Sequence, residues 1–133
     1  MEWRREFEIG VEAIDAQHRQ LFAQVGELLA AVAAGRPEAV GPALQFLHRY
    51  ALEHFAAEQA LMARAGYPRA DAHASEHARF ASDLLTLEAE RAAHPSSPWL
   101  ASKLGVGLAD WLRSHVLGSD RELGRFLQAQ GQR

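Results

Sequence analysis

The stretch LQFLHRYALEHFAAEQALM, residues 44–62, decides the fold because its apolar residues follow a helical period that two polar residues interrupt. Positions three or four residues apart lie on one face of a helix. On that face the residues are, in order, Leu44, Leu47, Ala51, His54, Glu58 and Leu61. A helix that buries this face therefore buries an imidazole and a carboxylate together with its apolar side chains.

On both sides of this stretch, glycine and proline interrupt the helical pattern. The breakers are Gly35-Arg36-Pro37, Gly66-Tyr67-Pro68 and Pro95-Ser96-Ser97-Pro98, with Gly118 near the far end. They separate four segments, roughly 12–34, 38–65, 70–93 and 99–117, each with an apolar stripe of helical spacing. We expect an all-α, up-down-up-down antiparallel four-helix bundle. An N-terminal arm (1–11) and a short C-terminal helix (119–130) complete one predicted domain, residues 1–133.

The composition excludes several classes of function. The chain has 133 residues, enough to bury a core without covalent staples. Its net charge of -3 is too small to indicate nucleic acid or a membrane surface as a partner. It has no cysteine, so any metal must be bound by His, Asp and Glu.

The N-terminal ten residues carry several charges, which is not typical of a signal peptide. The longest apolar run, Leu28 to Ala34, is too short to cross a bilayer. We therefore expect a soluble, cytoplasmic protein.

Each predicted helix places histidine on its apolar face. The five positions are His18, His54, His73, His77 and His115. Their heights along the bundle also agree. His18 lies 17 residues before the turn at Gly35, and His54 lies 19 residues after it. In the same way, His77 lies 19 residues before Ser96, and His115 lies 19 residues after it. One layer of the bundle should therefore collect all five imidazoles together with Glu58.

Asp120, five residues after His115, is off the simple helical period, but Gly118 could relax the backbone and let it turn inward. An uncompensated buried polar group costs about 1–3 kcal/mol. Seven such groups would cost on the order of 10 kcal/mol, comparable with the whole stability of a domain. Five nitrogens and two carboxylates are too many ligands for one ion, so two ions that share the carboxylates are predicted.

Taken one at a time, these residues have simpler interpretations. The pair His73 and His77 can arise by chance, Glu58 can be a solvated charge, and Asp120 can cap the last helix. The joint pattern on four helices favours a metal site. The other two histidines, His48 and His94, are interpreted as structural, since neither lies in the predicted layer.

Ligand type alone does not choose between iron, zinc, copper and nickel. A dinuclear site in a bundle is typical of di-iron proteins, but the Glu-x-x-His pairs of the ferritin type do not occur at this level. Two ferrous ions with two carboxylates and one hydroxide keep a positive charge, whereas four carboxylates without hydroxide leave none. We infer that the less anionic ligand set favours reversible dioxygen binding over cleavage of the O–O bond.

These residues resemble the hemerythrin family, in particular its single-domain bacterial members. The resemblance covers nearly the whole chain. It is carried by Trp3, Gly10, Ile14-Asp15-Ala16-Gln17-His18, His54, Glu58, Leu61-Met62, Gly66-Tyr67-Pro68, His73, His77, Trp111-Leu112-Arg113-Ser114-His115 and Asp120. Two positions depart from the family pattern: Gln59 stands where a second Glu is common, and Gly26 where a polar residue is more usual.

The resemblance implies two iron ions. One would be held by His73, His77 and His115, the other by His18 and His54, with Glu58 and Asp120 as bridges beside an oxo or hydroxo group. Dioxygen would bind at the iron of His18 and His54. Three apolar residues would wall this oxygen pocket and exclude water: Phe55, Trp111 and Leu112.

The sequence leaves three functions open. The leading one is reversible oxygen binding for storage, delivery or sensing, without enzymatic turnover. A di-iron enzyme acting on nitric oxide or peroxide is the second, and an iron-handling protein is the third. No protein partner is indicated.

Overall fold

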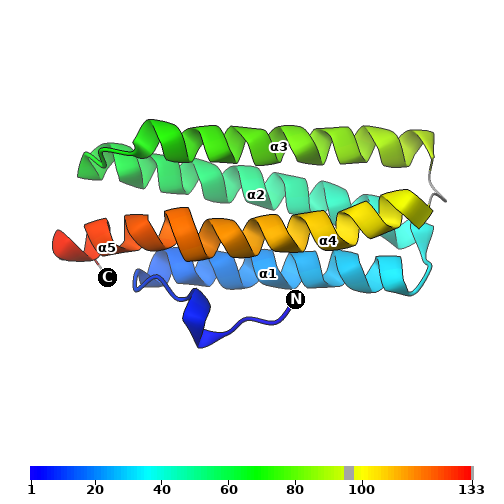
Figure 1. Ribbon diagram of the computed structural model, residues 1–133, viewed down its shortest axis with the longest axis horizontal. Helices are drawn as coiled ribbons and strands as arrows, with labels where there is room; N and C mark the ends of the chain where they lie inside the picture. The colour runs from blue at the N-terminus through cyan, green and yellow to red at the C-terminus, as the bar shows by residue number, and fades with distance from the viewer. Residues whose placement is uncertain (95–97, 133) are drawn as a thin grey trace.

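Four long helices form the antiparallel bundle that the sequence predicts (Figure 1). The computed structural model describes residues 1–94 and 98–132, and gives only the backbone over 98–106. The long helices are α1 (Glu12–Ala33), α2 (Pro37–Ala65), α3 (Ala70–Ala93) and α4 (Pro98–His115). A 3-10 turn, η1 (Arg5–Phe7), lies in the N-terminal arm; a π-helical turn, η2 (Val116–Asp120), and α5 (Arg121–Ala129) follow α4. No strand occurs in these ranges, and the predicted fold class is confirmed.

The ends of α1 and α2 explain why the glycines mark the turns. Gly35 and Gly66 have φ of +65° and +68°, in the left-handed region that favours glycine. After α2, Tyr67 N–H donates to the Met62 carbonyl and Gly66 N–H to the Ala63 carbonyl. This is the hydrogen-bond pattern of a Schellman motif, which satisfies the last carbonyls of a helix. Sharp turns of this kind make consecutive helices antiparallel neighbours.

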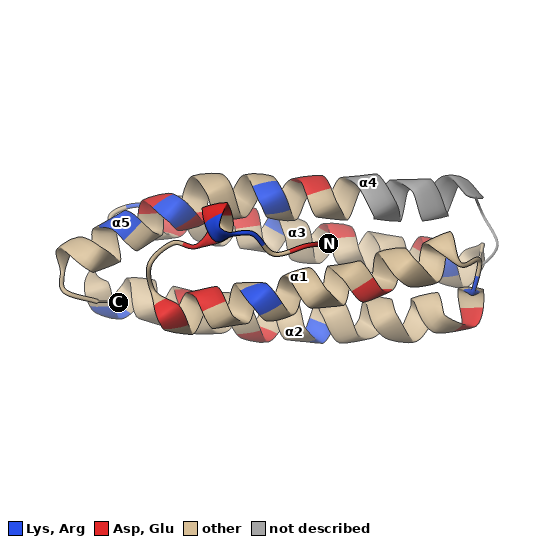
Figure 2. Ribbon diagram, turned by 90° about the horizontal axis from the view of Figure 1, so that it is seen from below, with Lys and Arg blue, Asp and Glu red and all other residues tan. Residues whose placement is uncertain are grey.

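The N-terminal arm packs on α1 and reaches the C-terminal region (Figures 1 and 2). Its Trp3 and Phe7 rings lie 5.0 and 4.8 Å from the ring of Phe22 in α1. The backbone of Met1 crosses Gly26 so closely that a Cβ there would lie 2.6 Å from the Met1 nitrogen. The departure from the family pattern at Gly26 therefore leaves room for the arm.

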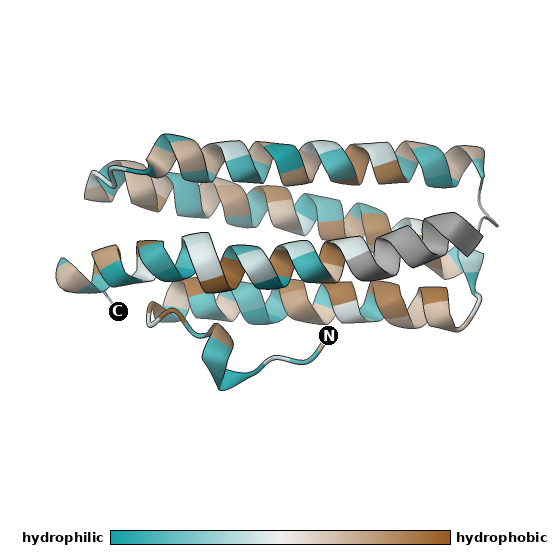
Figure 3. Cartoon of the chain, in the orientation of Figure 1, coloured by the Kyte–Doolittle hydropathy of each residue, from teal (hydrophilic) through white to brown (hydrophobic). Residues whose placement is uncertain are grey.

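The apolar core consists of two clusters with a polar layer between them. The larger cluster fills the bundle between α1, α2, α3 and α4 and includes Leu28, Leu44 and Leu84. The smaller one, at the end near α5, includes Ile14, Met62 and Leu123. Figure 3 shows several of the hydrophobic positions of α1 and α4 on the sides where these helices face each other. On α1, for example, the predicted ligand His18 lies between Ile14 of the smaller cluster and Leu21 of the larger one.

The end of α4 differs from the predicted helix. The chain does not break at Gly118; it passes through the π turn Val116–Asp120 directly into α5. Gly118 is not among the residues with positive φ. The change in helical spacing, and not a flexible glycine, therefore sets the orientation of Asp120 and of α5.

Figure 2 shows positively and negatively charged residues interspersed along the helices. Among the described residues, no helix is long and apolar enough to cross a membrane. Residues 95–97 of the predicted turn lie outside the described residues.

Candidate metal centre

The polar layer contains all seven residues predicted as ligands, and each is at most 4% exposed. They come from α1, α2, α3, α4 and the π turn. Their ligand atoms form two groups, and within each group the atoms lie within 4.8 Å of one another. The first group is Glu58, His73, His77, His115 and Asp120; the second is His18, His54, Glu58 and Asp120.

The two carboxylates belong to both groups because each turns one oxygen toward each side. Oε1 of Glu58 lies 2.5 Å from Nε2 of His73, and Oε2 lies 3.1 Å from Nε2 of His54. Oδ1 of Asp120 lies 3.2 Å from Nε2 of His115, while Oδ2 lies 3.1 Å from Nε2 of His18. Glu58 and Asp120 are therefore oriented to bridge two neighbouring cations.

The π turn explains how Asp120 reaches this layer. In a regular α-helix, positions four residues apart share a face, so a residue five positions after His115 would point away. A π turn accommodates one additional residue, since its hydrogen bonds join positions five apart. Asp120 is consequently 1% exposed and faces His115. Its side chain makes no capping hydrogen bond to α5, which contradicts the simpler interpretation as a helix cap.

The donor atoms of the layer are suited to metal ions, because they pair poorly with one another. Nε2 of His18 lies 3.1 Å from Nε2 of His54, and the Nε2 atoms of His77 and His115 are 3.2 Å apart. Both carboxylate oxygens of Glu58 and both of Asp120 are buried without a well-formed hydrogen bond. Buried polar atoms in native proteins are normally paired. One cation within each group would pair with all four of these carboxylate oxygens.

The ionisation of the layer shows the same preference for positive charge. Burial alone would lower the pKa of His18, but the charges of Asp120 and Glu58 raise it to about 10. Burial alone would raise the pKa of Glu58, but the close imidazoles of His18, His54 and His73, among others, hold it well below its ordinary value. Without metal, the two carboxylates stay ionised and hold protons on His18, His73 and His115, whose pKa values they raise.

Aromatic side chains cover the three-histidine group. The ring of Phe55 stacks on His77, with centroids 3.9 Å apart and planes 8° apart. Trp111 stacks on His115 at 4.6 Å and 12°. Leu112, the third residue of the predicted oxygen pocket, is buried at 3% exposure. Both rings therefore stack on ligands of the three-histidine group, and not on His18 or His54, beside which the oxygen pocket was expected. Phe55 also lies 5.8 Å from the ring of His54.

Sequence reasoning missed three residues that hold the ligands. Gln17 Oε1 lies 2.6 Å from Nδ1 of His54, and Glu76 Oε1 lies 3.2 Å from Nδ1 of His115. The hydroxyl of Ser119 donates to the same Glu76 carboxylate. Each of the three directly precedes a predicted ligand in the chain. A polar residue next to a ligand is the one feature of the sequence that could have pointed to them.

The remaining two histidines lie where the sequence predicts, outside the polar layer. His48 Nδ1 lies 3.1 Å from Glu88 Oε2, away from the polar layer, and His94 is exposed at the end of α3. Met62 is buried in the smaller apolar cluster. None belongs to either ligand group.

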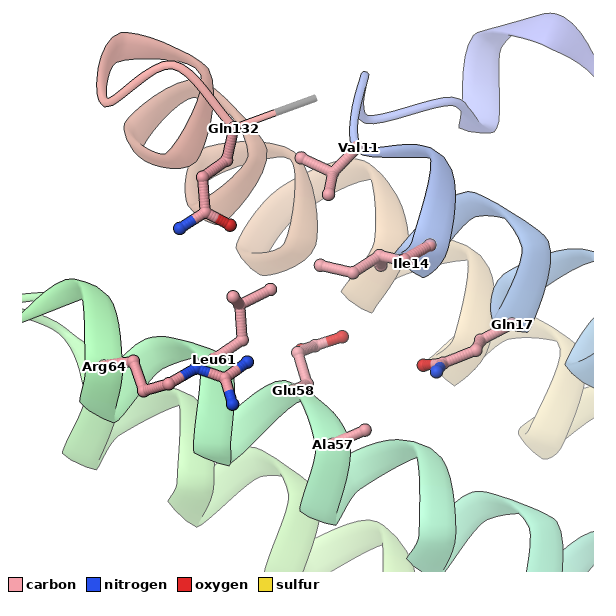
Figure 4. Close-up of a pocket in the computed structure, with 9 residues that line it drawn as sticks. Val11, Ile14, Gln17, Ala57, Glu58, Leu61, Arg64 and Gln132 are labelled. Carbon is pink, nitrogen blue, oxygen red and sulfur yellow. The ribbon is translucent and has the colours of Figure 1, made fainter.

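A cleft of about 400 Å³ between α1 and α2 reaches the second ligand group (Figure 4). Gln17 from α1 and Glu58 and Leu61 from α2 point into it, and Arg64 and Gln132 lie at its sides (Figure 4). Glu58, which belongs to both ligand groups, lines this cleft, and its neighbour Gln17 contacts His54.

Comparison with known proteins identifies close similarity over almost the whole chain. The model of the hemerythrin HHE cation-binding domain matches residues 9–127. The bacteriohemerythrin of Stenotrophomonas maltophilia is 30% identical over 119 residues, which cover 90% of this chain and 76% of that protein. That of Clostridium acetobutylicum is 29% identical and covers 90% and 95%. A crystal structure of wild-type hemerythrin superposes with a TM-score of 0.84 at 28% identity, covering 96% of this chain and 97% of the other.

Proposed function

Because the chain belongs to the hemerythrin family, we propose that it binds dioxygen reversibly at two iron ions held by its seven buried ligands. Oxygen binding is the function of this family, and the buried cluster of His, Glu and Asp fits a di-iron site. The role would be oxygen storage, delivery or sensing. A cytoplasmic location and the absence of a nucleic-acid partner stay predictions.

The observation that carries the proposal is the shared position of Glu58 and Asp120 in both ligand groups. A single-metal site needs no carboxylate with its two oxygens turned in opposite directions. His73, His77 and His115 would hold one ion, and His18 and His54 the other. The group with two histidines offers fewer protein ligands, so that ion has more room for a small exogenous ligand.

When bound, two ferrous ions would supply the two electrons that reversible dioxygen binding uses. The chain supplies the rigid frame and the dry surroundings. Gln17 orients His54 through its Nδ1, and the aromatic rings of Phe55 and Trp111 exclude water beside His77 and His115. Water exclusion removes a source of protons, which slows irreversible oxidation of the centre.

We further propose that the chain is a binding protein and not an enzyme. The test is anaerobic loading with ferrous iron, followed by an optical titration with air. We expect two irons per chain and a visible charge-transfer band that appears with oxygen and disappears when oxygen is removed. One metal per chain, or a spectrum that ignores oxygen, would contradict the proposal. Steady-state consumption of nitric oxide or peroxide with an electron donor would favour an enzyme instead.

A further inference from the structure

The carboxylate of Glu76 in α3 connects two parts of the segment that carries His115 and Asp120. Its Oε1 lies 3.2 Å from Nδ1 of His115, at the end of α4. Its Oε2 accepts a hydrogen bond of 2.6 Å from the Ser119 hydroxyl, in the π turn. One side chain from a neighbouring helix therefore contacts one predicted ligand directly and the residue before another.

The first contact fixes the histidine ring. A carboxylate accepts hydrogen bonds, so Nδ1 of His115 carries a proton, and Nε2 is the nitrogen left to offer a lone pair to a bound metal ion. That Nε2 faces the layer, 3.2 Å from Oδ1 of Asp120. Trp111 stacks on the ring and restricts its rotation. Such outer partners of metal-binding histidines set the tautomer and raise the basicity of the ligand.

The second contact fixes the π turn. A π turn is rarer than an α turn and needs support from its surroundings. Ser119 lies inside this turn, directly before Asp120, and its bond to Glu76 joins the turn to α3. The orientation of Asp120 thus depends on a contact that a regular helix would not form.

The other ligand group has a different partner. Nδ1 of His54 faces the amide oxygen of Gln17, which is neutral, whereas Nδ1 of His115 faces a carboxylate. A charged acceptor makes the stronger hydrogen bond. The two groups therefore differ in the electron density that their histidines can donate.

We propose that Glu76 is a positioning residue that holds His115 and, through Ser119, the turn of Asp120, so that both ligands meet the same metal ion. This inference rests on the ligand roles proposed above for those two residues. Glu76 itself lies outside both ligand groups. Its side chain is 43% exposed, so a substitution there changes hydrogen bonds more than it changes the packed core.

Zinc binding tests the inference without oxygen chemistry, because zinc accepts the same nitrogen and oxygen ligands. We expect wild type to bind two zinc ions, and Glu76→Gln to bind one of them about 10- to 100-fold more weakly, the usual cost of losing an outer partner. Ser119→Ala should weaken the same ion. The control is Glu122→Gln, which removes a nearby carboxylate that pairs with Arg69 and touches no ligand; it should bind zinc as wild type does.

A second measurement observes the His115 ring directly, first in the wild-type protein and then in the folded variants. In nitrogen NMR of the zinc-loaded protein, Nδ1 of His115 should carry a proton protected from exchange, and Glu76→Gln should change its frequency. Wild-type affinity and an unchanged His115 signal in both variants would overturn the inference and leave the proposed function intact. Fewer than two zinc ions in wild type would overturn both.

Discussion

Removal of the metal should make the stability of this protein fall as the pH rises from 6.5 to about 10. The reason is His18, whose pKa is raised from 6.5 to about 10 by Asp120 and Glu58, against the opposing effect of burial. A group whose pKa is higher in the folded state stabilises it fully below the unfolded pKa. That stabilisation is lost as the pH rises through the folded pKa. The pKa values of His73 and His115 are also raised, so these residues act in the same direction. Burial lowers the pKa of His77, which therefore acts in the opposite direction.

The size of the effect follows from the shift. Each pKa unit corresponds to about 1.4 kcal/mol, so a rise from 6.5 to about 10 makes His18 worth about 5 kcal/mol of unfolding free energy. A small domain has about 5–15 kcal/mol in total. The pKa of Asp120 is lowered, because His18 and His115 outweigh burial and the charge of Glu58. Its contribution to stability is therefore present above its unfolded pKa of 3.8 and disappears in acid. The metal-free protein should be most stable between pH 3.8 and 6.5, where both contributions are present.

The assay is urea unfolding, followed by circular dichroism, with a chelator and with metal. Bound metal replaces the protons, since its ligands must be deprotonated, so the loaded protein should lose much less stability across the same window. His18→Gln should flatten the metal-free curve, while His94→Gln, at an exposed position, should leave it unchanged. If the metal-free midpoint stayed level or rose from pH 6.5 to about 10, the electrostatic reasoning would be wrong.

Three substitutions or deletions test other parts of the structure. His77→Ala should lower metal affinity by more than the 10- to 100-fold expected for an outer partner. His48→Ala is the control and should still bind two ions. If metal analysis found the same number of ions in both variants, the assignment of His77 as a ligand would be wrong. Gly124→Ala should cost about 1–3 kcal/mol in urea unfolding, because its Cβ would lie 2.5 Å from a backbone oxygen of the arm; an unchanged midpoint would refute this contact. Deleting Gly118 should convert the π turn into an α turn and keep Asp120 on the metal face, so loss of one zinc ion would show that the five-residue turn is required.

Most of the fold could be predicted because the sequence encodes it locally. Breakers mark the turns, and Gly35 and Gly66 adopt the left-handed backbone for which glycine is suited. Between the breakers, each apolar stripe tells which face is buried. The predicted helix 70–93 agrees with Ala70–Ala93 in α3, and the first two helices agree within one residue at each end.

The metal ligands were predictable for the same reason: an imidazole at the position of a core residue interrupts a periodic stripe. The partners of those ligands were not. Gln17 and Glu76 lie one residue from a ligand, which on an isolated helix places them away from the buried face. Their hydrogen bonds go to ligands on other helices. Such contacts depend on how far each helix is rotated in the bundle, and a single helical period does not contain that information.

Asp120 shows where the periodic argument reaches its limit. Five residues after His115, it should face away from the layer in an α-helix, and its inward turn was expected from the flexibility of Gly118. The structure keeps Gly118 in ordinary backbone geometry and changes the helical spacing instead. Three contacts act on this turn together: His115 and His18 face the Asp120 carboxylate, and Glu76 binds Ser119. A π turn is unfavourable by itself, so these three residues are needed to stabilise it. By stabilising the turn they set the position of the Asp120 carboxylate at the metal centre. A helix that served only packing would not need such contacts.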